Sequence, residues 1–122
     1  MYFEIDGHSA LKSALDTMCE ELARGNVPAG KVFDSKLAVN ELVINALRYG
    51  GGRAYVSATL QGGELRITVR SENAYCPPEN SVCPSTYAEH GRGLYLVDMV
   101  CARRAYSKEE GICIVLCVEN EG

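Results

Sequence analysis

Apolar residues follow a helical spacing in the first part of the chain. Between residues 9 and 24 they recur every three or four positions. These positions are Leu11, Leu15, Met18 and Leu22. The spacing predicts an amphipathic helix, because it places all four side chains on one face. Residues 2–6 alternate weakly and predict a short strand before this helix, and the glycines and proline of residues 25–30 end it.

A second helix is expected to run to about Tyr49, where the three glycines of residues 50–52 stop it. We expect it to begin near Asp34 or Ser35. Either side chain can accept a hydrogen bond from the free amides of a first helical turn, which makes both residues candidate caps.

The middle of the chain contains a hairpin and a long loop. Residues 54–60 and 64–70 are rich in β-forming side chains and are joined by the QGG of residues 61–63. Glycine takes the positive φ angles that a tight turn requires, so this segment predicts a β-hairpin. Residues 74–91 contain three prolines and no apolar periodicity. They predict a long loop of the kind that often forms a lid or a binding segment.

Helical spacing returns from Gly93 to about Tyr106, and the apolar run of residues 112–118 predicts a strand covered by helices. The apolar faces of these elements are buried most simply in an α+β fold. We expect a two-layer α/β sandwich with helices on one face of a mixed or antiparallel sheet. A chain of 122 residues has room for one such core, so residues 1–122 are expected to form a single domain.

Composition and charge exclude several classes of protein. The net charge of −4 has the wrong sign for tracking nucleic-acid phosphates, so no nucleic-acid partner is expected. No apolar run approaches the length of about 18 residues that would cross a membrane, and residues 1–6 do not resemble a secretion signal. We therefore expect a cytoplasmic protein without a membrane partner. The six cysteines include no CxxC pair, which favours free thiols over disulfides or zinc.

Three polar side chains of the second helix are spaced four residues apart. Glu41, Asn45 and Tyr49 would form one ridge beside the apolar face of that helix. A carboxylate and a carboxamide placed there are unfavourable unless something binds them. Hydrogen bonds to nearby backbone groups, or a position at the solvent boundary, would also account for them.

The junction between the long loop and the third helix is a candidate anion site. It reads Gly91-Arg92-Gly93-Leu94. The first amides of a helix have no partner within the helix and carry partial positive charge, and glycine lets an anion approach closely. The same sequence also suits an ordinary transition from loop to helix. A nucleotide that binds with Mg²⁺ needs both features, an oxygen ligand for the cation and free amides for the phosphates.

These residues carry a resemblance to a known family. The segment Glu41-x-x-x-Asn45-Ala-x-x-Tyr49 resembles the N box of the GHKL ATPases, and Gly91-Arg-Gly-Leu94 is similar to the glycine box that ends their ATP lid. The resemblance covers nearly the whole chain and is closest to the stand-alone anti-sigma factor serine/threonine kinases. It implies a histidine-kinase-like ATPase domain with an ATP lid at about residues 74–91.

The resemblance implies a role for each matching residue. Asn45 would supply its side-chain oxygen to Mg²⁺, Glu41 would orient or deprotonate the attacking hydroxyl or water, and Tyr49 would line the nucleotide pocket. The ATP phosphates would be surrounded by the residues of the glycine box, which are Gly91, Arg92, Gly93 and Leu94.

One position departs from the family pattern. The family usually has an aspartate and a glycine at the end of a strand, where the aspartate reads the adenine amino group, and this chain has neither. Asn73 is the best substitute, because its carboxamide oxygen can also accept a hydrogen bond, and Ser71 is the competing alignment. A neutral acceptor in place of a charged one reduces the affinity by about 1 kcal/mol, or roughly fivefold.

The resemblance leads to one main hypothesis and two alternatives. The main one is an ATP-dependent protein kinase that transfers the γ-phosphoryl group to a serine or threonine of a partner, and that regulates a sigma factor. Its partner would be a sigma factor or an anti-sigma antagonist, and whether it forms a homodimer is left open. The alternatives are a non-catalytic nucleotide-sensing or protein-binding module, and the detached catalytic domain of a histidine kinase.

Overall fold

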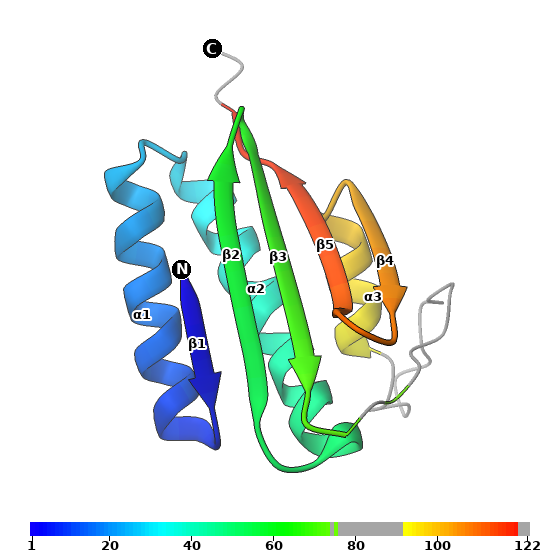
Figure 1. Ribbon diagram of the computed structural model, residues 1–122. Helices are drawn as coiled ribbons and strands as arrows, with labels where there is room; N and C mark the ends of the chain where they lie inside the picture. The colour runs from blue at the N-terminus through cyan, green and yellow to red at the C-terminus, as the bar shows by residue number, and fades with distance from the viewer. Residues whose placement is uncertain (74, 76–91, 120–122) are drawn as a thin grey trace.

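The computed structural model describes residues 1–73, 75 and 92–119. Their elements are β1 (Tyr2–Ile5), α1 (His8–Arg24), α2 (Ala29–Asn45), η1 (Ala46–Gly50), β2 (Ala54–Gln61), β3 (Glu64–Ser71), α3 (Arg92–Val100), β4 (Arg103–Ser107) and β5 (Gly111–Cys117). Figure 1 shows the helices α1, α2 and α3 behind one sheet. The strand order is β1-β2-β3-β5-β4, and all neighbouring strands are antiparallel. The predicted two-layer α/β sandwich is confirmed, with an antiparallel sheet.

One face of the sheet and one face of each long helix meet in the core. Side chains along β3 alternate between exposed and buried, which is typical of an antiparallel sheet covered on one side. The predicted apolar stripe of α1 is confirmed, since Met18 and Leu22 are almost completely buried. The largest buried side chains of the sheet are Ile5, Val56, Leu65, Ile67, Ile114 and Leu116. Among the described helices, none is both long and apolar enough to cross a membrane.

The start of α2 differs from the expectation. The helix begins at Ala29, with Pro28 at the N-cap and no side-chain cap, so the predicted start at Asp34 or Ser35 is wrong. Proline suits this position because its φ angle is fixed near the helical value and it lacks the N–H that a first turn leaves unpaired. Ser35 is fully buried inside the helix, where its hydroxyl donates a hydrogen bond to the Lys31 carbonyl at 2.7 Å.

The third helix is shorter than expected. It ends at Val100, so the predicted helix up to Tyr106 is wrong over its second half, and β4 instead forms a hairpin with β5. Arg104 of β4 turns back to α3, where its guanidinium donates to both carboxylate oxygens of Asp98, at 2.6 and 3.1 Å. The strand is stabilised both by its ladder with β5 and by this largely buried ion pair.

Candidate functional site

The carboxyl end of α2 carries the first two predicted site residues. Glu41 and Asn45 are half-buried, while Leu42 and Val43 between them are fully buried. One helical turn separates Glu41 from Asn45. Within the described part of the chain, neither side chain has a hydrogen bond or an ion pair. Backbone groups of the described residues therefore do not account for these two polar side chains, whereas their half-buried place is consistent with a position at the solvent boundary.

Directly after Asn45 the helix widens into a π-helical turn, η1. The Ala46 amide still donates to the carbonyl of Leu42, four residues earlier, and also to that of Val43. The sequence predicted where the helical segment ends, at about Tyr49, but not its change of type. Such π turns are rare and are frequently found at functional sites. Tyr49 lies in this turn, 46% exposed.

The first turn of α3 lies directly against Glu41. A Cβ atom added to Gly93 would overlap Glu41 Oε2 and would lie 3.2 Å from the carboxyl carbon. The free amides that open α3 therefore lie beside the carboxylate of α2. Leu94 of the same turn is buried, whereas Gly91 and the Arg92 side chain lie outside the described residues. The structure thus brings together two of the predicted motifs, although they are far apart in sequence.

The end of β3 is attached to η1. The Asn73 backbone N–H donates a hydrogen bond to the Gly50 carbonyl at 3.1 Å. The Ser71 hydroxyl donates one to the Asn73 backbone carbonyl. Ser71 is 8% exposed, while the Asn73 side chain is exposed. A Cβ atom on Gly51 would lie 3.5 Å from Asn73 Nδ2. Of the two candidate acceptors on this strand, Asn73 therefore offers the accessible side chain, next to the helix that carries Asn45.

Tyr75 connects this region to the β4–β5 hairpin. Its ring lies 5.9 Å from the Tyr49 ring, centroid to centroid, with 46° between the two planes. Its hydroxyl is buried and has no hydrogen-bond partner among the described residues. Burial raises the pKa of Tyr75 to about 12, and the neighbouring hydroxyls of Tyr49 and Tyr106 act in the same direction. Apart from Tyr75, the predicted lid at about residues 74–91 lies outside the described residues.

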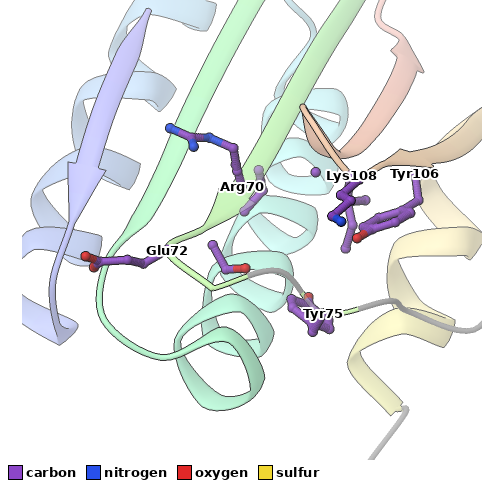
Figure 2. Close-up of a pocket in the computed structure, with 9 residues that line it drawn as sticks. Arg70, Glu72, Tyr75, Tyr106 and Lys108 are labelled. Atoms are coloured by element: carbon purple, nitrogen blue, oxygen red, sulfur yellow. The ribbon is translucent and has the colours of Figure 1, made fainter.

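A small cavity of about 100 Å³ lies beside Tyr75, between the end of β3 and the β4–β5 turn. In Figure 2, Tyr106 and Lys108 lie on one side of this cavity, and Tyr75 lies below them. Its lining is completed by Val69, Arg70, Ser71, Glu72, Gly111 and Ile112. Sequence reasoning missed Tyr106 and Lys108 because it placed the first in a helix and the second in no element. Their signal was the short strand-turn-strand pattern before the last apolar run.

The cysteines of the described residues are free thiols, as predicted. They are Cys19, Cys101, Cys113 and Cys117. Burial raises the thiol pKa of both Cys19 and Cys101. Across the residues that the structure describes, no three His, Cys, Asp or Glu side chains are grouped to hold a metal ion.

Fold and site together define a class of protein. A half-buried carboxylate and carboxamide on one helix, next to the free amides of another, suit a nucleotide, because they offer oxygen ligands to its cation and donors to its phosphates. The fold is thus an α/β sandwich with a site whose geometry suits a nucleotide. The chain belongs to the family described as the histidine kinase-like ATPase domain, whose model matches residues 8–118. This match supports the GHKL resemblance and ATP binding. A comparison with curated proteins gave no match.

Proposed function

We propose that this protein binds ATP with Mg²⁺ and transfers the γ-phosphoryl group to a serine or threonine of a partner protein. The partner would be a sigma factor or an anti-sigma antagonist, as the resemblance to anti-sigma factor kinases implies. One observation carries the proposal: the Glu41 carboxylate lies against Gly93 at the start of α3. This contact supports the proposal, because it would bring a proton acceptor close to amides that could bind the phosphates.

The residues around Asn45 fit a magnesium ion. Mg²⁺ prefers oxygen ligands and usually takes only one or two from the protein, with the rest from phosphates and water. The half-buried Asn45 amide oxygen would be the protein ligand. When bound, the cation would neutralise charge on the phosphates.

The other residues would bind and position the nucleotide. The first amides of α3, including that of Leu94, would donate hydrogen bonds to phosphate oxygens. Tyr49 would line the pocket. The side-chain carboxamide oxygen of the exposed Asn73 would accept a hydrogen bond from the base. Glu41 would accept the proton of the attacking serine or threonine hydroxyl while the hydroxyl oxygen bonds to the γ-phosphorus. The bond from the γ-phosphorus to the β,γ-bridging oxygen would break at the same step, and ADP would leave.

Nucleotide binding is tested by thermal denaturation with Mg-ATP. At one hundred times the dissociation constant, binding should stabilise the protein by about 2.7 kcal/mol. Asn45→Ala should remove most of this gain. Asn40→Ala is the matched control, because Asn40 is a half-buried residue of the same helix outside the proposed ligand set, and it should keep the gain. If Mg-ATP has no effect on the folded wild-type protein, the proposed function is wrong.

Phosphoryl transfer is tested separately with radiolabelled ATP and a candidate partner. Glu41→Ala should retain ATP binding and lose transfer. Transfer that continues undiminished in this variant would exclude Glu41 as the base. A second candidate function, a nucleotide-sensing module without transfer, is favoured by the neutral Asn73 at the base-reading position. ATP binding with no transfer to any partner would support it.

A further inference from the structure

Gly93 has no backbone requirement for glycine. Glycine is needed where φ is positive, as in the turn formed by Gly62 and Gly63, with φ values of 60° and 77°. Gly93 is not among the positive-φ glycines, and it lies inside α3, where alanine is the better helix former. Its identity must be explained by what surrounds it.

Among the described residues, the three heavy atoms nearest to a Cβ built at Gly93 all belong to one side chain, that of Glu41. A Cβ atom there would overlap Glu41 Oε2 and would lie 3.2 Å from Cδ and 3.4 Å from Cβ of the same residue. By comparison, a Cβ on Gly30, in the first turn of α2, would meet nothing within 4 Å. The space that a methyl group would take at Gly93 is therefore filled by the Glu41 carboxylate.

We propose that Gly93 is a positioning residue, which holds the Glu41 carboxylate at a fixed place beside the first amides of α3. Within the described residues Glu41 has no hydrogen-bond or ion-pair partner, and its carboxylate occupies the space that a side chain at position 93 would fill. The role of that carboxylate as proton acceptor rests on the proposed function. The steric relation between the two residues does not.

The direct test is Gly93→Ala. The added methyl group meets the end of a flexible side chain rather than backbone, so the variant should fold and melt no lower than the wild type. Its affinity for Mg-ATP should change by less than about threefold. The rate of phosphoryl transfer should fall by roughly 10- to 100-fold, because a displacement of about 1 Å has that effect on a reacting group. Gly30→Ala is the control and should transfer at the wild-type rate.

A double-variant comparison separates positioning from a direct effect on the phosphates. In a Glu41→Ala background, Gly93→Ala should have no further effect on binding or transfer, because the group that it displaces is already gone. If Gly93→Ala weakens Mg-ATP binding equally with and without Glu41, the glycine acts on the phosphates themselves and the inference is overturned.

An NMR measurement needs neither nucleotide nor partner. Glu41→Gln removes the negative charge that lies beside the first turn of α3, so it should move the Leu94 amide resonance relative to the wild type. In a Gly93→Ala background the same substitution should produce half of this movement or less. The difference between Glu41→Asp and Glu41→Asn should be equally small, because both place their group farther from α3 while Gly93 is kept, and this pair serves if the alanine variant does not fold. If these variants retain the full movement, the positioning role is refuted. If the movement behaves as expected but Mg-ATP does not bind, the proposed function alone fails.

Discussion

Gly50 offers a sharp test of how the π turn is attached to β3. Gly50 is buried, and a Cβ atom there would overlap the Ser71 side chain and lie 2.6 Å from the Asn73 carbonyl oxygen. Both neighbours are held in place. Ser71 ends a central strand, and the Asn73 backbone N–H donates a hydrogen bond to the carbonyl of Gly50 itself. Gly50→Ala must therefore push η1 away from β3.

The magnitude follows from three terms. Overfilling a packed site costs about 1–3 kcal/mol. Loss of the hydrogen bond between Asn73 and Gly50 adds about 1 kcal/mol. The lower chain entropy of the unfolded alanine variant returns about 0.4–1 kcal/mol. We expect a net loss of about 1–3.5 kcal/mol in the free energy of unfolding.

Urea denaturation measures this loss as a lower midpoint at an unchanged slope. Gly30→Ala is the matched control, since its Cβ meets nothing within 4 Å, and it should not lower the free energy of unfolding. If Gly50→Ala unfolds within about 0.5 kcal/mol of the wild type, the contact between η1 and β3 is not as close as described.

Two further predictions concern charge and pH. Asp98→Asn should lower the free energy of unfolding by about 2 kcal/mol, because the 8%-exposed Arg104 donates hydrogen bonds to both oxygens of that carboxylate. Glu64→Gln, which removes the charge of an exposed ion pair, should lower it by less than about 1 kcal/mol in the same urea denaturation. Equal losses in the two variants would contradict this prediction. The pKa of Tyr75 rises from 10.0 to about 12 on folding, so its contribution to stability is fully present below pH 10 and is lost between about pH 10 and 12. The free energy of unfolding of Tyr75→Phe should fall less steeply with pH across that window than that of the wild type. Identical pH profiles of the two proteins would argue against a buried hydroxyl.

The fold was predictable wherever a single periodicity determined the element. The apolar stripe of α1 and the glycine turn between β2 and β3 depend on local spacing alone, and both predictions are confirmed. The start of α2 and the strand β4 were predicted wrongly. In α2 a proline replaces the side-chain cap that was sought. In β4 the polar Arg104 points inward, because Asp98 on another element neutralises it, and a sequence pattern does not contain that pairing.

The site was predictable in part. The spacing of Glu41 and Asn45 and the glycines before the third helix indicated two polar features, and the family resemblance connected them. The contact between Glu41 and Gly93 depends on how α2 packs against α3, which spacing does not determine. The π turn also could not be predicted, because it does not change the order of apolar and polar residues along the chain.

The strand order has a consequence for synthesis of the protein on the ribosome. β5, the last strand that the structure describes, lies between β3 and β4. Until residues 111–117 have emerged, the nascent chain leaves one edge of β3 open, and β4 has no neighbour to join. An open edge beside exposed apolar side chains invites association with other chains. We therefore expect the sheet to close only after residues 111–117 have been translated, and products truncated before them to require chaperones.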